Sequence, residues 1–164
     1  MNRHRDCPSA SKFGSLSLPI VLMPQRMVYD LRLETPSVTD YIAIRLKAGL
    51  SRKSKEAAAV GLANTLFSVV AYHGNERVGI GRIIGDGGCF FEVTDVAVLP
   101  DHQGKGVGSL IMESLADFLK RNAPKTAFVG LFAEQGTPEF YNKFGFNKAE
   151  SADLLGMYMR IPGE

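Results

Sequence analysis

The sequence has few of the residues that mark specialised classes of protein. Its 164 residues contain only two cysteines, Cys7 and Cys89, which lie far apart and lack metal-ligand spacing. This argues against a disulfide scaffold and against a zinc site, and it suits a reducing compartment. No apolar run is long enough to span a bilayer. The formal net charge is only +2, so no strong attraction to nucleic acid or to a membrane surface is expected.

The composition is that of an ordinary soluble domain, with 45% hydrophobic and 22% charged residues. We expect one domain over residues 27–164, in the cytoplasm, preceded by a disordered tail over residues 1–26. Basic residues among serines leave an organelle-targeting signal open for this tail. The disordered tail is the favoured interpretation, because Asp6, Pro8 and Gly14 interrupt any amphipathic helix.

Local patterns predict an α/β (α+β) fold with one mixed sheet covered by helices. Ser37 and Ser54 are expected to cap the first two helices. Alternating and β-branched runs predict the strands, and helical spacing of apolar residues predicts the helices. The strands are expected over residues 27–34, 65–73, 76–85, 89–100, 126–133, 144–150 and 153–161, and the helices over residues 38–48, 54–62, 106–121 and 138–144.

One loop stands out, the stretch LPDHQGKGVG over residues 99–108, which we call the glycine loop. Its three glycines lie at the start of a predicted helix, where each would cost about 1 kcal/mol relative to alanine. A helix N-terminus has unpaired N–H groups and a partial positive charge, and missing Cβ atoms let an anion approach them. The loop therefore predicts a phosphate or pyrophosphate site, with Lys105 as a mobile cation. A glycine-rich turn without ligand is the alternative.

Two common nucleotide motifs fit the glycine loop poorly. A Walker A loop needs Ser or Thr after its lysine, whereas Gly106 follows Lys105. A dinucleotide fingerprint needs G-x-G-x-x-G in the first strand–helix unit, whereas this loop comes after three strands with a hairpin pattern. Nor is there a G-x-S-x-G segment that would support a hydrolase triad.

Two segments together resemble the GCN5-related N-acetyltransferases (GNAT family). Residues 103–108, QGKGVG, resemble the family's Q/R-x-x-G-x-G/A signature, and residues 93–100 resemble the strand before it. Downstream, PEFYNKFGF over residues 138–146 is similar to the family's FY-x-x-x-GF segment. The resemblance covers about residues 27–161. It implies a mostly antiparallel twisted sheet with one splayed parallel strand pair, flanked by helices.

The resemblance also implies acetyl-CoA as co-substrate, with no metal. The pyrophosphate would lie on backbone N–H groups of the glycine loop, and Val96 and Val98 would pair with the pantetheine amides like an added strand. The acetyl carbonyl would then lie near N–H groups of the same strand. The predicted cofactor-binding residues are Val96, Ala97, Val98, Gln103, Gly104, Lys105, Gly106, Val107, Gly108, Ser109 and Tyr141.

Two catalytic residues are predicted for attack of an amine on the thioester. Tyr141 matches the family position of a general acid, which would protonate the leaving thiolate; the alternative is a tyrosine packed in the core. Glu92 is the first candidate for the base, and a solvated carboxylate is the alternative. Asp95 would face the other side of the strand unless a bulge intervenes. Where many members have asparagine, this chain has Glu134, which leaves that cofactor contact open.

The acceptor is predicted to be a small primary amine. Residues 45–62 carry more basic than acidic groups, with Arg45 among them, so a strongly cationic acceptor is disfavoured. Acetylation of protein or peptide amines and a non-catalytic CoA-binding sensor remain the alternatives. A homodimer through the edge of strand 154–161 is a further possibility. His102 is expected to be an exposed loop histidine without a role.

Overall fold

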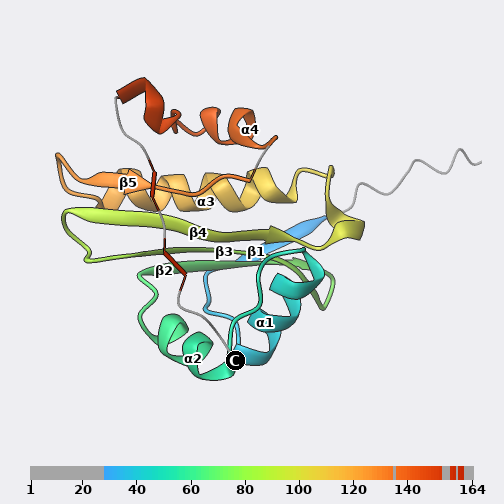
Figure 1. Ribbon diagram of the computed structural model, residues 1–164. Helices are drawn as coiled ribbons and strands as arrows, with labels where there is room; N and C mark the ends of the chain where they lie inside the picture. The colour runs from blue at the N-terminus through green and yellow to red at the C-terminus, as the bar shows by residue number, and fades with distance from the viewer. Residues whose placement is uncertain (1–27, 135, 153–155, 158, 161–164) are drawn as a thin grey trace, which may run out of the picture.

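The fold is a single five-stranded sheet with helices on both faces (Figure 1). The computed structural model describes residues 28–134, 136–152, 156–157 and 159–160. The strand order along the sheet is β1-β2-β3-β4-β5, the same as the order in the chain. The strands are β1 (Tyr29–Arg32), β2 (Phe67–His73), β3 (Glu76–Gly85), β4 (Phe90–Val98) and β5 (Phe128–Gly130).

The pairing of the strands confirms the predicted mixed sheet. The first four strands pair antiparallel; short connections join β2 to β3 and β3 to β4, whereas α1 and α2 lie between β1 and β2. The last pair, β4 and β5, is parallel and extends over only three residue pairs, from Phe90↔Phe128 to Glu92↔Gly130. Beyond these pairs, β5 no longer pairs with β4, so the predicted splay of the parallel strands is present.

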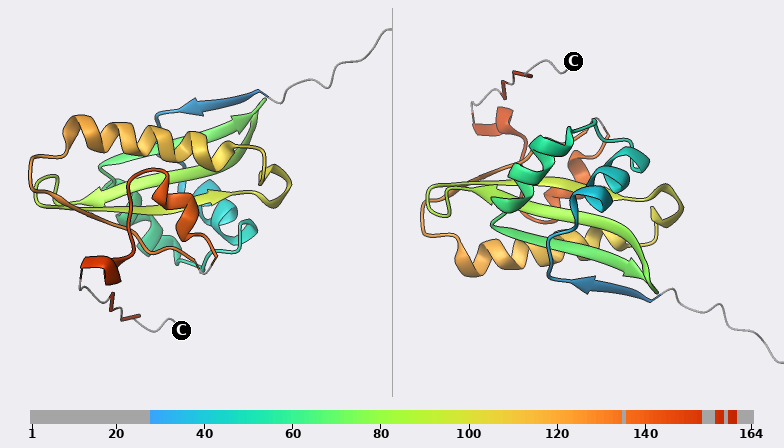
Figure 2. Two further views of the ribbon diagram at one scale, coloured as in Figure 1. Left: turned by 90° about the horizontal axis from the view of Figure 1, so that it is seen from above. Right: turned by 90° about the horizontal axis from the view of Figure 1, so that it is seen from below.

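The helices form a layer on each side of the sheet (Figure 2). Helix α3 (Val107–Asn122) covers one face, while α1 (Val38–Lys47) and α2 (Lys55–Ala63) cover the other; α4 (Pro138–Asn142) follows β5. The predicted N-caps are confirmed, because the hydroxyls of Ser37 and Ser54 accept hydrogen bonds from the N–H groups of residues 40 and 57 at 3.1 Å. Each cap satisfies a donor that the first helical turn leaves unpaired.

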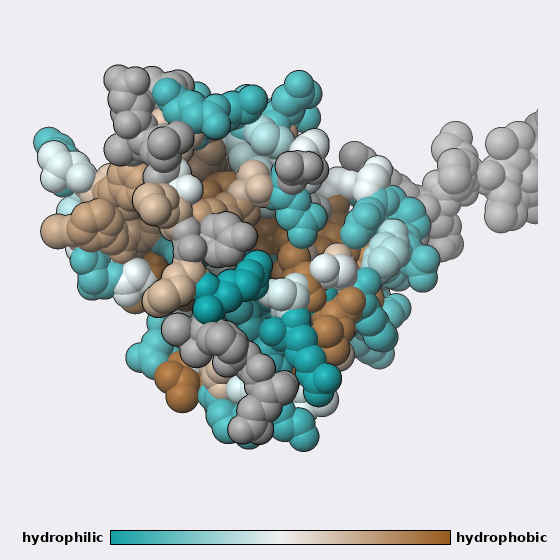
Figure 3. Space-filling model, viewed as in Figure 1, coloured by the Kyte–Doolittle hydropathy of each residue, from teal (hydrophilic) through white to brown (hydrophobic). Residues whose placement is uncertain are grey.

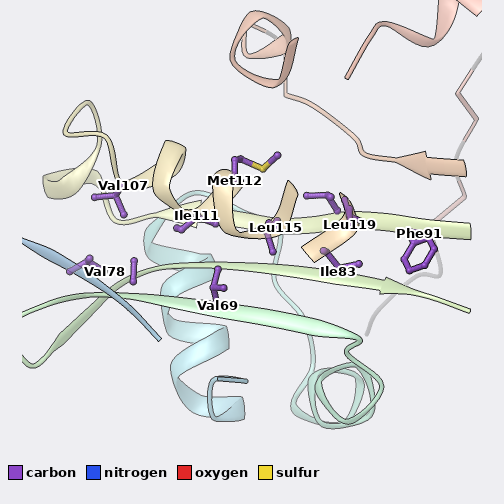
Figure 4. Packing of buried hydrophobic residues seen from close by; sticks show 11 residues of the cluster. Val69, Val78, Ile83, Phe91, Val107, Ile111, Met112, Leu115 and Leu119 are labelled. Carbon is purple, nitrogen blue, oxygen red and sulfur yellow. The ribbon is translucent and has the colours of Figure 1, made fainter. Parts of the chain in front are cut away.

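Two hydrophobic clusters fill the layers and fix how the helices lie on the sheet. Alternate residues of β2 point into opposite clusters, as the two-residue period of a strand requires. The first cluster joins α3 to the sheet (Figure 4), and the second joins α1 and α2 to it. The fully buried members of the first cluster include Val69, Val78, Ile83, Val107, Ile111, Met112 and Leu115.

Helix α3 packs unusually close to β3, over Gly79 and Gly81. A Cβ atom placed on Gly81 would lie 2.4 Å from Ile111 Cγ2 and 3.0 Å from Leu115 Cδ1. A Cβ on Gly79 would lie 3.0 Å from Ile111 Cδ1. The missing side chains therefore form the shallow groove into which α3 fits, and they set the distance between the helix and the sheet.

We expect Gly81→Ala to lower the free energy of unfolding by about 1–3 kcal/mol, the usual cost of overpacking a core. Gly61→Ala is the matched control, because Gly61 lies in α2 and a Cβ there would meet nothing within 4 Å. This control should raise stability by about 0.5–1 kcal/mol through its helix propensity. Urea unfolding curves of both variants measure these opposite changes in the free energy of unfolding. Equal stability of the Gly81 variant and the parent would contradict the packing argument.

The predicted strand over residues 144–150 is wrong. Phe144 and Gly145 instead close the last turn of α4, where Phe144 N–H donates to the Tyr141 carbonyl at 2.9 Å and Gly145 has φ +93°. A short 3₁₀-helix follows over Ala149–Ala152. The alternating aromatic residues that predicted a strand pack against the α3 cluster instead. The other closing strand, 153–161, lies largely outside the described residues.

An apolar region lies on the surface at the end of the sheet where β4 and β5 pair (Figure 3). Phe90 and Phe128 are each more than half exposed there, and their rings lie 6.3 Å apart between centroids. Among the described residues, no helix has both the length and the apolar character needed to cross a bilayer. The predicted tail, residues 1–26, lies outside the described part of the chain.

Candidate active site

The glycine loop leads from β4 into α3 and brings backbone N–H groups to one point. It passes through a short 3₁₀-helix over Pro100–His102, and then through Gly104 and Gly106, both left-handed with φ +68° and +87°. Gly106 is the N-cap of α3, and no side chain caps this helix. The first N–H groups of α3 therefore remain available to an acceptor, and the positive end of the helix dipole lies among them.

A hollow of about 350 Å³ lies against this loop and is lined by most of the predicted cofactor residues. Glycines without side chains form much of its wall, so a ligand there can approach the backbone itself. Phe140 of α4 lines it as well, and the sequence prediction had missed that role. The lining residues are Val98, Gln103, Gly104, Gly106, Gly108, Ser109 and Phe140.

Five of the predicted cofactor residues lie outside the wall of this hollow, and one of them, Tyr141, is described separately below. Val107 is buried in the α3 cluster, so only its backbone is open to a ligand. Ala97 is buried in the α1–α2 cluster, and its backbone pairs with Ile80 of β3. Lys105 is exposed, and its Nζ donates to the Asp101 carbonyl at 2.6 Å. Val96 is half-buried against the α3 cluster.

The backbone of Val98 points away from β3, toward the gap between β4 and β5. Leu99 N–H donates to the Val78 carbonyl at 2.8 Å, in the register that pairs Val98 with Gly79. Alternate residues of an antiparallel strand bond to opposite neighbours, so Val98 presents its N–H and C=O on the other side. The Gln103 side-chain amide donates to that carbonyl at 2.9 Å and joins the glycine loop to the end of β4.

Tyr141 lies on α4, beside the splayed strands, and it is half-buried against the α3 cluster. Its ring packs edge-on against Phe140 with centroids 5.0 Å apart. Among the described residues, its hydroxyl has no hydrogen-bond partner. Burial raises the pKa of this phenol above its ordinary value of 10.0, and the negative charge of Glu134 raises it further. Tyr141 therefore holds its proton firmly at neutral pH.

Glu92, Thr94 and Asp95 share the face of β4 that is covered by α1 and α2. Thr94 lies opposite Arg82 and Glu92 opposite Ile84, and the Arg82 side chain reaches the Gly61 carbonyl of α2. Cross-strand partners lie on the same face, which places Glu92 and Thr94 there too. Asp95 joins them because β4 bulges at this point. Regular alternation would have placed Glu92 and Asp95 on opposite faces of β4. The bulge, which the prediction had allowed for, places them on the same face.

Asp95 does not have the environment of a general base. It is buried and accepts hydrogen bonds from Tyr41, Arg45 and Arg82, including one from Arg82 Nε at 2.7 Å. Charge-assisted bonds of this kind stabilise the ionised carboxylate and make it a poor proton acceptor. Of the two acids on β4, Glu92 is the one that remains half-exposed and without such partners among the described residues.

The basic region that was expected to face the acceptor is smaller than predicted. Arg45 is buried in the ion pair with Asp95, and Leu62 is in the core. The charged groups left on the surface of this region are Lys47, Arg52, Lys53, Lys55 and Glu56. No cluster of three or more metal-ligating side chains occurs in the part of the chain that the structure describes.

The expectation of an exposed His102 is wrong. His102 is only 9% exposed, and its Nδ1 lies 3.1 Å from the Tyr29 hydroxyl. Its ring also packs near His73, with centroids 5.3 Å apart. The 3₁₀-helix after β4 turns the residue back under the sheet, whereas its place in a polar loop had indicated a solvated side chain. His102 thus attaches the start of the glycine loop to β1 and β2.

Comparisons with known proteins agree with this arrangement. Residues 64–148 match the acetyltransferase (GNAT) domain family. A solved structure from methicillin-resistant Staphylococcus aureus, described as a protein of unknown function and probable acetyltransferase, is 40% identical. It has a TM-score of 0.77 and is covered over its whole length by 82% of this chain.

Two curated relatives come from photosynthetic eukaryotes. The uncharacterized N-acetyltransferase ycf52 of Porphyra purpurea is 38% identical over 81 residues, 49% of this chain and 45% of the relative. The histone acetyltransferase TAP1 of Glycine max is 30% identical over 133 residues, 74% of this chain and 56% of the relative. The matches thus span about half the length of these relatives. The family match covers more than half of this chain and includes the glycine loop and Tyr141: the chain belongs to the GNAT family of acetyltransferases.

Proposed function

We propose that the protein is an acetyl-CoA-dependent N-acetyltransferase that acts on a primary amine. The observation that carries this proposal is the hollow at the uncapped N-terminus of α3, which opens beside the splayed end of β4. The uncapped helix N-terminus suits an anion such as a pyrophosphate. The unpaired edge of β4 suits an amide-bearing chain that pairs with it like a strand. Acetyl-CoA contains both groups in one molecule.

The proposed reaction is direct transfer. The neutral amine nitrogen attacks the thioester carbonyl and forms the amide bond, while the C–S bond breaks. Strand N–H groups near Val96 stabilise the oxyanion that develops on the carbonyl oxygen. Tyr141 donates its proton to the departing thiolate, and Glu92 accepts the proton that the amine loses, directly or through water. No metal takes part in this scheme.

For the acceptor we propose a small primary amine with an anionic or aromatic part. The exposed charged groups over residues 45–62 are four cations, Lys47, Arg52, Lys53 and Lys55, with Glu56 as the acid among them. A cationic surface attracts anionic ligands and repels polyamines or lysine-rich tails. Because only a few charges form this surface, we expect them to affect the association rate of the acceptor as much as its affinity.

A second candidate is acetylation of a protein lysine. It is favoured by the Glycine max relative, which is described as a histone acetyltransferase and aligns with 74% of this chain. The lysine-rich targets of such an enzyme would have to avoid the cationic surface of the α1–α2 region. A third outcome is a domain that binds CoA without turnover.

The test is release of free CoA thiol from acetyl-CoA with three matched sets of acceptors. These are small amines that carry a carboxylate or phosphate, the same amines without the acid group, and lysine peptides with acidic or basic flanking residues. Fastest turnover with the anionic small amines supports the proposal. Turnover of lysine peptides alone would establish the second candidate, and tight CoA binding without turnover in any set would indicate a binding module.

A further inference from the structure

Strand β4 contains a bulge that sets the orientation of the strand end at the proposed acetyl site. Ile80 pairs with Ala97 and Arg82 pairs with Thr94, so two residues of β4, Asp95 and Val96, lie opposite the single residue Gly81 of β3. The extra residue is Asp95, which has φ +56°, in the left-handed region. Only Thr126 shares a positive φ with it among the described non-glycine residues. Such a conformation typically costs 1–3 kcal/mol and needs support from its surroundings.

The bulge changes which side of the strand each later residue occupies. Before it, Val93 packs into the α3 cluster; after it, Val96 and Val98 pack there, whereas regular alternation would have placed Asp95 and Ala97 on that side. The backbone changes with the side chains, since a shift of one residue exchanges the two sides of a strand. Val96 and Val98 point away from β3 because of this single extra residue.

A buried cluster of charges holds the Asp95 side chain in place. Asp95 is bound by Arg45 and Arg82, and the Tyr41 hydroxyl donates to its Oδ2 at 3.0 Å. The side chains of Asp95 and the two arginines are each less than one-tenth exposed. Two guanidinium groups share one carboxylate, so loss of the Asp95 charge would leave two buried positive charges without a counter-charge.

The same two arginines extend the cluster to the helices that cover this face. Arg45 Nη2 donates to the Ser51 carbonyl at 2.9 Å, in the segment between α1 and α2. Arg82 Nη1 donates to the Gly61 carbonyl at 3.0 Å and to the Thr65 hydroxyl at 2.6 Å, at the end of α2. The bulge is therefore attached both to its neighbouring strand and to the α1–α2 region.

We infer that Asp95 is a positioning residue: its bonds to Arg45, Arg82 and Tyr41 hold the β4 bulge and thereby direct the Val96 and Val98 backbone groups toward the acetyl-CoA thioester. The identity of the ligand in this inference rests on the proposed function. The anchoring of the bulge by Asp95 does not depend on it. Asp95 touches neither ligand nor proton in this role. Its effect on turnover passes entirely through the geometry of the strand.

Two substitutions test the inference without removing the whole cluster. Asp95→Asn keeps the size, a left-handed preference and one acceptor oxygen, while it weakens the bonds to both arginines. Tyr41→Phe removes a single hydrogen bond and keeps the ring. We expect kcat to fall at least about tenfold in the first and about threefold in the second, while the Kd for CoA changes less than about threefold. Calorimetric titration and thiol release measure the two quantities on the full chain.

Amide hydrogen exchange gives a readout that does not need acetyl transfer. In the parent, the Ala97 and Leu99 amides, bonded toward β3, should exchange slowly, and those of Val96 and Val98 quickly. In Asp95→Asn, exchange at Ala97 should accelerate at least about tenfold, while the amides of β2 keep their protection. This local change identifies loss of the bulge geometry rather than loss of the fold.

The outcomes separate the inference from the proposed function. A lower kcat with retained CoA affinity and local exchange at Ala97 supports the positioning role. Turnover within twofold of the parent in both folded variants, or protection lost uniformly across the sheet, overturns it. If the parent neither binds CoA nor acetylates an amine, the proposed function fails; the exchange pattern then decides alone, because unchanged exchange at Ala97 refutes the anchoring and faster exchange supports it.

Discussion

Replacement of Gly106 by valine should abolish CoA binding, with a rise in Kd of at least about a hundredfold. A Cβ at this position would meet no other atom within 4 Å, so it would project into the open space in front of the helix N-terminus. An anion would have to occupy that same space to reach the N–H groups of α3. Loss of even two charge-assisted hydrogen bonds, at about 1.5–3 kcal/mol each, accounts for the expected change. Calorimetric titration with CoA measures it.

Gly49→Val is the matched control for this variant. Gly49 has φ +86° against +87° at Gly106, and a Cβ there would also meet nothing within 4 Å. Both variants therefore carry the same backbone strain, of about 1–3 kcal/mol, and their melting temperatures should fall alike. Only the Gly106 variant should lose CoA. Equal CoA affinity in the two variants would show that the pyrophosphate does not bind at the glycine loop.

Tyr141→Phe should lower kcat by about 10²- to 10⁴-fold, the usual contribution of general acid catalysis. The substitution keeps the ring and its packing against Phe140, so CoA affinity and stability should change little. Tyr72→Phe serves as the control, since burial raises the pKa of Tyr72 as well, and Tyr72 lies in β2 away from the glycine loop. Steady-state turnover of both variants measures the difference. A Tyr141 variant with parental kcat would make Tyr141 a core residue.

The pH profile adds an independent check on the same residue. A general acid works only while protonated, and burial together with Glu134 raises the pKa of Tyr141 above 10.0. Turnover that depends on this phenol should therefore persist to about pH 9.5 and be lost only as the pH rises through its raised pKa. A fall in kcat well below pH 9 that disappears in Tyr141→Phe would contradict this assignment of its pKa.

The sheet and its helices followed from local patterns that tertiary packing did not override. Serine caps, strand alternation and the apolar period of α3 each agreed with the final fold, which is the condition under which such patterns are informative. The segment over residues 144–150 failed for the opposite reason. Its Phe-x-Phe pattern suits a strand, but the turn at Gly145 and packing of both rings against the α3 cluster decided its conformation.

The glycine loop could be placed from sequence because its glycines have a local cause, a backbone that needs positive φ and open space. The Asp95 cluster could not, because its members come from α1, β3 and β4, and only the fold brings them together. A signal did exist. Arg82 and Asp95 are isolated charges in otherwise apolar strand segments, VGIGRIIG and VTDVAV, and a charge in such a place requires a partner. The bulge that turns Asp95 toward its arginines cannot be recognised in the sequence in a comparable way.

The groove that Gly79 and Gly81 form for α3 connects ligand binding to the stability of the whole domain. The N–H groups at the N-terminus of α3 belong to its first turn, and the next turns pack over Gly79 and Gly81 through Ile111 and Leu115. The site for the anion is therefore formed by a helix that belongs to the packed core and exists only in the folded domain. Any anion held there raises the melting temperature of the entire domain in one cooperative step, which makes thermal denaturation a sensitive reporter of its occupancy.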